Sequence, residues 1–405
     1  MGETVSSSTK QSAPAPQYLT FAVVLTVVLV AGLIAPVASA LVALIGVAVL
    51  SGKPKVAGFT TVGVVGGIFA WINMSKAIQG DWSWYVQHYL ILEYTPLSSY
   101  LGVLVRGVRP DPSEPLYYLF ARFLSVASGG DVELLAFVVT CVIYGAIGTA
   151  LVLALTSATR SPWTVVVGTS AGMLVGLTFT LTTQLVRQEI SAALIGLAVV
   201  TSAYRKWTPT VMIVVAAALT HNSALIPAAG LGLAVLFRRS GGGRTLRFAI
   251  SGAVFYALGQ LYLTTSGNSD YTGQDDGAIS TAVIALDAVI LGTFLFLVWR
   301  RGLGENAVAS TVLLCVPAFY GFVLGVASQP LPLLRMYFYI EVLRALMVGL
   351  ICVSLMRGQW DFLFGLAIVG LAITYLLLRI EQSPFVYGIS PLDLLLWMPL
   401  TGLGP

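Results

Sequence analysis

The chain has 405 residues, of which 57% are hydrophobic and 9% are charged, and its formal net charge is +4. A mean hydropathy of +0.90 excludes an ordinary soluble domain, because apolar runs recur along nearly the whole sequence. The runs are long and continuously apolar, which indicates membrane-spanning helices instead of the short alternating strands of a barrel. We therefore predict an all-α polytopic membrane protein.

The N-terminal segment is rich in Ser, Pro and Gln and lacks the ordered regions of a cleaved signal peptide. We expect residues 1–17 to form a disordered cytoplasmic tail and residues 18–405 to form a single transmembrane domain. Helix rise measured against bilayer thickness gives about 13 spans. The spans are predicted at residues 18–34, 37–51, 56–74, 132–156, 162–183, 189–204, 208–221, 223–237, 247–264, 281–299, 307–327, 336–356 and 361–379.

Basic residues in short loops predict the orientation of these spans. With a cytoplasmic N-terminus, most short basic loops fall inside, and the loops 75–131 and 265–280 fall outside. The inside cations are Lys53, Lys55, Arg160, Arg205, Lys206, the Arg238–Arg247 cluster, Arg300, Arg301 and Arg357. The topology rule does not explain the others, and a charge in the membrane is costly unless it is paired or functional. These are Lys76, Arg106, Arg109, Arg122, Arg187, Arg335, Arg344 and Arg379.

The first outer loop begins with GDWSWYVQHY, residues 80–89. Asp81, Tyr85 and either His88 or Tyr89 recur at helical spacing, which places a carboxylate, a phenol and an imidazole on one stripe of a helix. The alternative is a surface helix whose Trp and Tyr side chains serve only as interfacial anchors. The motif alone does not decide between them.

The same loop continues with DPSEPLYYLFARF, residues 111–123. Pro115 suits the first position of a helix, and segment 115–129 is too short and too charged to span, so we predict a re-entrant or interfacial helix. Glu114, Tyr118 and Arg122 are four residues apart, which aims a carboxylate from the helix start. The alternative is an N-terminal charge that complements the helix dipole.

Arg187 in QLVRQEISAALIG stands at the mouth of a predicted span. A guanidinium is a permanently charged planar fork that suits phosphate oxygens. Ser191 follows Arg187 by one helical turn. The alternative for Arg187 is a local ion pair with Glu189.

His221 in THNSALIP lies at a span boundary beside Asn222 and Ser223. A neutral imidazole in an outer turn is a suitable proton acceptor or donor near neutral pH. The alternative is a helix-end histidine that donates to a backbone carbonyl.

The segment SQPLPLLRMYFYIEVLRAL contains Arg335 at the start of a span and Tyr339 one turn below it. No residue adjacent in the sequence neutralises Arg335, whereas Glu341 and Arg344 are spaced to form a structural pair within the helix. The polar loop 267–280 carries Asp270, Asp275 and Asp276 at a spacing that favours a solvated loop over a cation site. No nucleotide-binding, serine-hydrolase or zinc motif has a suitable context, so we expect no metal and no cofactor.

Five motifs in this order, GDWSWYVQHY, EPLYYLFARFL, VRQEISAALIGLA, HNSALIP and RMYFYIEVL, resemble the EpsG-like, Wzy-type family of bacterial polysaccharide polymerases. The resemblance covers residues about 70–345. It implies a GT-C-like membrane glycosyltransferase of the bacterial inner (plasma) membrane. Such an enzyme joins oligosaccharide repeat units carried on polyprenyl diphosphate at the outer face, without a cofactor. Lipid-linked glycans and the bilayer are the implied partners, a chain-length regulator is a candidate partner, and no nucleic acid is expected.

The resemblance also carries roles onto single residues. The acidic and aromatic motif of the family falls on Asp81, Tyr85 and Tyr89, and its Glu-Pro motif falls on Glu114 and Pro115. Its arginine, its histidine and its late arginine-aromatic motif fall on Arg187, on His221 and on Arg335 with Tyr339. The Trp-rich GDWSW and the Asp-rich loop 267–280 depart from the family pattern.

A lipid-diphosphate sugar donor is already activated, so the site needs a base, cations for the leaving phosphate and aromatic platforms for sugars. The base is left open among the candidate catalytic residues Asp81, Glu114 and His221. The candidate diphosphate-binding residues are Arg187, Arg335 and Arg122. The candidate sugar-binding residues are Trp82, Trp84, Tyr85, His88, Tyr89, Tyr117 and Tyr339.

Other functions stay open at this point. A flippase or exporter of lipid-linked sugars would carry charges near the middle of the bilayer and internal repeats. Asp287, Glu341 and Arg344 are the few candidates for deep charges, and no convincing repeat is present. A glycosyltransferase that uses a polyprenyl-monophosphate sugar and an O-antigen ligase are the remaining alternatives.

Overall fold

The computed structural model describes residues 36–100, 113–239, 243–265, 279–301, 303–356, 358, 360–383 and 385–387. These residues are helical apart from turns and one isolated β-bridge between Lys76 and Tyr387. The chain divides into two compact units, one of residues 1–47 with 390–405 and one of residues 48–389. All the side chains discussed below belong to the second unit.

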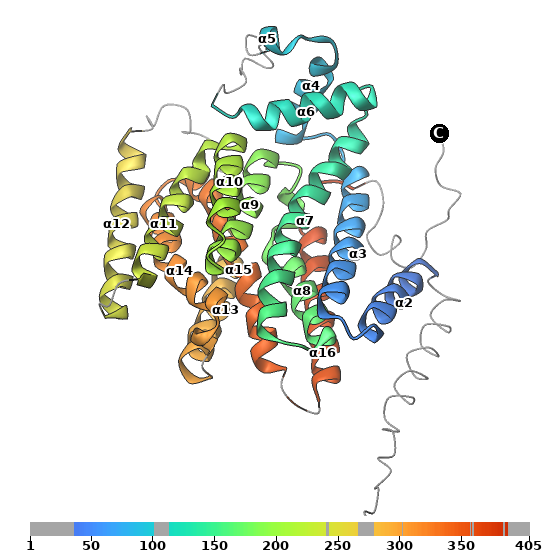
Figure 1. The fold of residues 1–405 in the computed structure, drawn as a ribbon. Helices are drawn as coiled ribbons and strands as arrows, with labels where there is room; N and C mark the ends of the chain where they lie inside the picture. The colour runs from blue at the N-terminus through green and yellow to red at the C-terminus, as the bar shows by residue number, and fades with distance from the viewer. Residues whose placement is uncertain are drawn as a thin grey trace, which may run out of the picture. The chain divides into compact units, whose positions relative to one another are not determined.

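Most of the described helices begin and end within a few residues of a predicted span, whereas α8 ends at Gly176, well before the predicted end of span 162–183 (Figure 1). Their bounds are α2 Pro36–Leu50, α3 Pro54–Met74, α4 Asp81–Tyr94, α5 Leu97–Tyr100, α6 Pro115–Ser128, α7 Val132–Ala158, α8 Pro162–Gly176, α9 Val186–Ala203, α10 Trp207–Thr220, α11 Leu225–Arg239, α12 Arg244–Thr265, α13 Thr281–Arg300, α14 Ala307–Gly325, α15 Pro330–Leu355 and α16 Asp361–Glu381. The predicted span 18–34, the tail 1–17 and nearly all of the loop 265–280 lie outside the described residues.

Within the described part of the chain, eight helices are long and apolar enough to cross a bilayer, and α8, α10 and α11 are shorter apolar helices. The eight are α3, α7, α9, α12, α13, α14, α15 and α16. Large apolar side chains such as Leu371 (72% exposed) and Met212 (67% exposed) cover outward surfaces, which suits contact with lipid. The chain is therefore a polytopic, all-helical membrane protein.

Small residues let some of these helices approach closely. A side chain added to Gly321 of α14 would lie 2.5 Å from the backbone oxygen of Gly252 in α12. Gly325 and Gly259 repeat the contact further along the same pair of helices, at 2.9 Å. Membrane helices gain packing energy by this close approach, because lipid provides no hydrophobic force to drive them together.

The helices alternate in direction, so their connections gather at two ends of the bundle. At one end, the Tyr204 hydroxyl donates to the Leu153 carbonyl at 2.8 Å, and Arg301 donates to the Ser354 carbonyl at 2.9 Å. The basic turn Arg205–Lys206 lies at this end. The starts of α9 and α15 and the end of α10 lie at the other end.

Helices α4 and α6 pack against each other at that other end (Figure 1). Ser125 donates to the Tyr89 carbonyl at 2.7 Å, and the Tyr89 hydroxyl lies 2.7 Å from the Ser128 hydroxyl. α6 begins at Pro115, as predicted, and is too short to span. α4 buries Trp82, Tyr85 and Leu92 together with four other residues, so the alternative of a simple surface helix is wrong.

A buried charge network joins α13, α15 and the end of α8. Arg344 contacts Asp287 at 3.0 Å and Glu341 at 3.2 Å, and it donates twice to the Gly176 carbonyl at 3.0 and 2.8 Å. Glu341 also accepts the backbone N–H of Thr178 at 2.8 Å. These bonds use the carbonyl left free where α8 ends, which explains why the predicted span 162–183 is interrupted. They confirm the predicted Glu341–Arg344 pair.

Candidate active site

Glu114 is the centre of a cluster made from three separate segments. One carboxylate oxygen forms an ion pair with Nη1 of Arg187, and the other is hydrogen-bonded to Nδ1 of His221. The backbone N–H of Asn222 donates to that second oxygen at 3.3 Å. The Glu114 side chain is only 1% exposed, so these partners compensate its burial. The structure thus joins the starts of α6 and α9 to the turn after α10.

Local backbone geometry makes each of these groups available. Glu114 precedes α6 but makes no side-chain cap, which leaves its carboxylate for other partners. Arg187 lies in the first turn of α9, where the helix dipole disfavours a cation, so the Glu114 carboxylate stabilises it there. His221 is extended, with φ −155° and ψ 123°, between α10 and a 3₁₀ turn over Asn222–Ala224.

Aromatic side chains surround the Arg187 guanidinium. Its central carbon lies 5.2 Å from the ring centre of Trp84, 5.8 Å from that of Tyr85 and 5.9 Å from that of Tyr118. Nη1 donates to the Tyr118 hydroxyl at 3.0 Å and Nε donates to the Tyr85 hydroxyl at 3.5 Å. Tyr117 packs edge-on against both tyrosines. Among the described residues no acceptor is bonded to Nη2, so this nitrogen is the one left for a ligand.

A glycine and a glutamine fix the start of α4 beside Arg187. Gly80 has φ +58°, and a Cβ there would lie 2.7 Å from Oε1 of Gln184. That oxygen accepts the backbone N–H of Trp82 at 3.2 Å, and the amide nitrogen donates to the Gln79 carbonyl at 3.2 Å. Only glycine fits this left-handed position without strain. The clamp therefore connects α4 to the segment that leads into α9.

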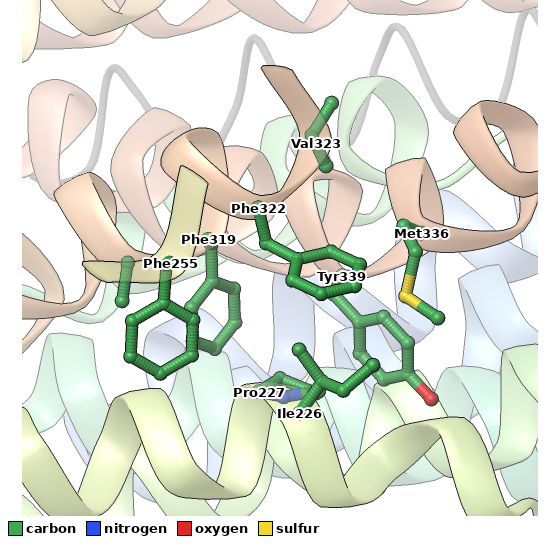
Figure 2. A pocket seen from close by; sticks show the side chains of 9 residues that line it. Ile226, Pro227, Phe255, Phe319, Phe322, Val323, Met336 and Tyr339 are labelled. Carbon is green, nitrogen blue, oxygen red and sulfur yellow. The ribbon is translucent and has the colours of Figure 1, made fainter. Parts of the chain in front are cut away.

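Tyr339 of α15 reaches the cluster through its hydroxyl group. The hydroxyl lies 2.9 Å from the Ser223 hydroxyl and 3.2 Å from the Ser191 hydroxyl. Its ring packs among apolar side chains including Phe322 and Met336 (Figure 2), and the crevice there is only about 10 Å³. That space holds at most a water-sized group, so the ring face is not open to a sugar. We keep only the hydroxyl of Tyr339 in the candidate site.

Asp81 and Arg335 border the same cluster. Desolvation raises the pKa of the Asp81 carboxyl, and the positive charges of Arg335 and Arg187 act in the opposite direction. Arg335, half-buried on α15, thus has a counter-charge that is distant in the sequence. The first residue of α4 and the start of α15 are brought together by the fold.

Three predicted site residues have other contacts. Arg122 donates to the carbonyls of Leu92, at 2.9 Å, and Thr95, so it satisfies the end of α4. Tyr89 is bonded to α6 as described above, and Trp82 lines a different cavity. The structure therefore does not bring Arg122, Tyr89 or Trp82 to the Glu114 cluster. Sequence spacing alone could not distinguish these three residues from the members of the cluster, because it does not show which face of a helix packs against which neighbour.

His88 lies behind the cluster. Its ring is 4.1 Å from that of Trp84, and the side chain is buried. Burial, assisted by the positive charge of Arg187, lowers the pKa of His88 to about 4. His88 is therefore neutral near pH 7 and supports the Trp84 ring instead of carrying charge.

The predicted alternative of an Arg187–Glu189 pair is wrong, because Arg187 pairs with Glu114. Glu189 is fully buried, and its carboxylate has no hydrogen-bond partner within the described residues. Tyr118 and Ser223 belong to the cluster but were not predicted as site residues. The four-residue spacing from Glu114 could have indicated Tyr118, whereas Ser223 is recognisable only through its contact with Tyr339.

The contact between Glu114 and His221 leaves one nitrogen of the imidazole able to accept a proton. A carboxylate only accepts hydrogen bonds, so we assign the proton of neutral His221 to Nδ1, facing Glu114. Nε2 is then unprotonated and can accept a proton, as in other carboxylate-histidine pairs. In the part of the chain that the structure describes, no group of three His, Cys, Asp or Glu residues could hold a metal ion. Asp270, Asp275 and Asp276 lie outside that part.

Comparison with known proteins gives one match. A model described as the EpsG family matches residues 60–392 of the chain. No curated protein and no solved structure matches it. The matched range contains every residue of the Glu114 cluster.

Proposed function

The chain belongs to the EpsG family, and from this membership and the Glu114 cluster we propose that it polymerises oligosaccharide repeat units carried on polyprenyl diphosphate. We propose further that it is a GT-C-like glycosyltransferase of the bacterial inner membrane, working at the extracytoplasmic face. The observation that carries the proposal is that one carboxylate holds an arginine and a histidine together at a partly open position. Glycosyl transfer from a lipid diphosphate uses a base for the acceptor hydroxyl and a cation for the leaving diphosphate, and a histidine and an arginine can supply these two functions.

In the proposed step, an acceptor hydroxyl oxygen bonds to the anomeric carbon of the donor sugar while the bond from that carbon to the diphosphate breaks. The hydroxyl proton passes to Nε2 of His221, and Glu114 orients the imidazole and stabilises its charged form. The diphosphate leaves with the electron pair of the broken bond. Arg187, through Nη2, and Arg335 stabilise its additional negative charge. Asp81 is the alternative base, since it lies at the border of the same cluster.

The aromatic residues near Arg187 have two roles in this proposal. Trp84, Tyr85 and Tyr118 hold the guanidinium by cation–π contacts and hydrogen bonds, which fixes the fork before the donor arrives. The Trp84 ring also lies nearest to the guanidinium, so we propose it as the platform for the donor sugar. Tyr117 supports this arrangement from behind.

The proposed orientation puts the cluster outside the cell. Its support is the position of the basic turns at the opposite helix ends, because basic loops stay in the cytoplasm. Cysteines introduced at the exposed positions Ser98 and Lys206 test it with an impermeant thiol reagent. In intact cells, or spheroplasts, Ser98→Cys should react and Lys206→Cys should not. The reverse pattern would place the cluster in the cytoplasm and exclude an extracytoplasmic polymerase.

The flippase alternative receives less support. Its expected deep charges, Asp287, Glu341 and Arg344, are bonded to one another and to backbone groups. A transport cycle would have to break this network in the membrane interior.

A chain-length regulator stays a candidate partner, and the length of the products formed in its presence tests it.

Purified protein in lipid, supplied with polyprenyl-diphosphate-linked repeat units, tests the proposal. We expect a ladder of products that differ by one repeat unit each. Transfer of a single glycan to another lipid core would indicate a ligase. Movement of the lipid-linked glycan across vesicles without chemical change would indicate a flippase, and either outcome would overturn the polymerase proposal.

A further inference from the structure

A cavity lies among the end of α3 and the starts of α4 and α7. Its volume is about 410 Å³, within the size range of small-molecule sites. Its floor contains the buried side chains of Asn73, Lys76 and Trp82, and its rim contains the exposed side chains of Ile78 and Glu133. The rim is open to the outside, whereas the side chains of the floor are at most 4% exposed. It shares no lining residue with the Glu114 cluster.

Two acceptors without a partner among the described residues belong to this cavity, the Asn73 amide oxygen and the Glu133 carboxylate, besides the indole N–H of Trp82, which is a donor. The Asn73 amide nitrogen donates to the Thr140 hydroxyl at 3.0 Å, but its oxygen, although fully buried, has no hydrogen-bond partner among the described residues. A buried carbonyl oxygen without a partner costs about 1–3 kcal/mol, which a donor on a ligand would recover. The Glu133 carboxylate adds a second acceptor at the rim. The cavity therefore favours a ligand that carries hydroxyl or amide donors.

Lys76, the cation among the described residues of the lining, is already engaged. The Lys76 amine donates to the Thr180 carbonyl at 2.5 Å and lies 4.2 Å above the ring centre of Phe385. An anionic ligand would face the Asn73 oxygen and the Glu133 carboxylate, which disfavours a phosphate or diphosphate here. A lipid diphosphate thus suits the Arg187 side of α4 and not this cavity.

Most of the remaining lining is apolar, and the Ser75 hydroxyl donates to the Ile72 carbonyl at 2.9 Å. The indole of Trp82 contributes to the apolar part, together with Met74, Val132 and Ala136. A sugar ring combines hydroxyl donors at its edge with C–H groups on its faces, which matches acceptors set in an aromatic and aliphatic wall. A purely apolar ligand would leave the Asn73 oxygen buried and unsatisfied.

We propose that this cavity is a carbohydrate subsite that binds a sugar of the glycan distant from the diphosphate, through Asn73, Glu133 and Trp82. The inference rests on the proposed polymerase function. It deepens that function by separating the place where the glycan is held from the place where its diphosphate leaves. Gln184, which is bonded to Trp82 and Gln79, connects the two places.

Binding of the oligosaccharide released by mild acid from the lipid-linked pool of the source cells tests the proposal on purified protein. Val132→Trp should fill the cavity, and Glu133→Ala, at an exposed position, should remove an acceptor without affecting folding. We expect Val132→Trp to weaken oligosaccharide binding by about tenfold or more. Glu133→Ala should weaken it by a smaller factor. Val126→Trp, at an exposed position of α6 outside the cavity, is the matched control and should bind as the wild type.

The kinetics separate this inference from the proposed function. Val132→Trp should raise KM for the lipid-linked donor glycan and leave kcat near the wild-type value at saturation. Wild-type ladders with unchanged binding and KM in Val132→Trp would overturn the subsite and leave the polymerase proposal standing. If the wild type binds the oligosaccharide but makes no ladder, and Val132→Trp loses the binding, the subsite would stand and the polymerase proposal would fall. Absence of binding to the wild type would overturn the subsite.

Discussion

Arg187 and Arg344 each pair with a carboxylate from a distant part of the chain, but their surroundings differ. Arg344 is fully buried, and all three of its guanidinium nitrogens are bonded to Asp287, Glu341 or the Gly176 carbonyl. Arg187 is 19% exposed, and among the described residues its Nη2 is bonded to no acceptor. An arginine whose bonds are complete joins helices, whereas one with an unused nitrogen at an open position can bind a ligand. The two clusters should therefore respond differently to mutation.

The largest expected effect is on folding, at Arg344. Arg344→Ala leaves Asp287 and Glu341 buried without their cation, which should cost about 3–5 kcal/mol of stability. We expect little folded protein on size-exclusion chromatography in detergent. Replacing the network as a whole, with Arg344→Met, Asp287→Asn and Glu341→Gln together, should recover much of the yield. Normal yield from Arg344→Ala alone would contradict the structural role.

The next effect is on activity, at His221. His221→Ala removes the proposed base, and general-base catalysis contributes roughly a hundredfold to ten-thousandfold in rate. Turnover per folded protein, measured from ladder formation, should fall in that range, while the unfolding temperature falls less than in Arg344→Ala, because Glu114 keeps its ion pair with Arg187. Asp81→Asn provides the comparison, because turnover that falls further in Asp81→Asn than in His221→Ala would transfer the role of base to Asp81.

A smaller loss of activity is expected at Arg187. Each charge-assisted contact is worth about 1.5–3 kcal/mol, so Arg187→Ala should lower turnover by roughly tenfold to more than a hundredfold. Arg187→Lys should lose less, because it keeps the charge and loses only the planar fork. Turnover of each variant is normalised to the amount of folded protein. An equal loss of turnover in Arg187→Ala and Arg187→Lys would mean that the planar shape of the guanidinium, and not its charge, makes the larger contribution to the rate.

The smallest effect is a pH dependence of stability at Lys76. Burial lowers the pKa of Lys76 to about 7, well below its value in an unfolded chain. Between about pH 7 and pH 10 the unfolded chain therefore binds more protons, so the free energy of unfolding rises with pH. From about pH 7 to pH 9 the unfolding temperature should rise by a few degrees more in the wild type than in Lys76→Met. Parallel curves for the two proteins would contradict this.

Much of the fold follows from the sequence because apolar runs and turn residues act locally. The start of α6 at Pro115 was predicted from the preference of proline for the first helical position. The end of α8 at Gly176 was not, since it depends on a carbonyl that accepts bonds from Arg344, far along the chain. Local patterns predict helices well and miss interruptions that distant partners stabilise.

The sequence pointed to several residues that the structure brings together, but it did not show which of them contact one another. Charges in unexpected places pointed to Glu114 and Arg187, but the sequence offered Glu189 as the partner of Arg187, because it is nearby. Arg122 illustrates the opposite error, since its charge serves the backbone carbonyls at the end of α4. Sequence distance is a poor guide to which charges meet when helices return to the same end of a bundle.

The single-turnover rate of glycan transfer in Glu114→Gln and Glu341→Gln tests the central claim most directly, because the same change is made in each cluster. Glu114→Gln should slow transfer by about a hundredfold or more, since an amide cannot stabilise the His221 imidazolium, and it should lower the unfolding temperature less than Glu341→Gln does. Glu341→Gln should lower the unfolding temperature and leave transfer per folded protein near the wild-type rate. Wild-type transfer in Glu114→Gln would contradict the account.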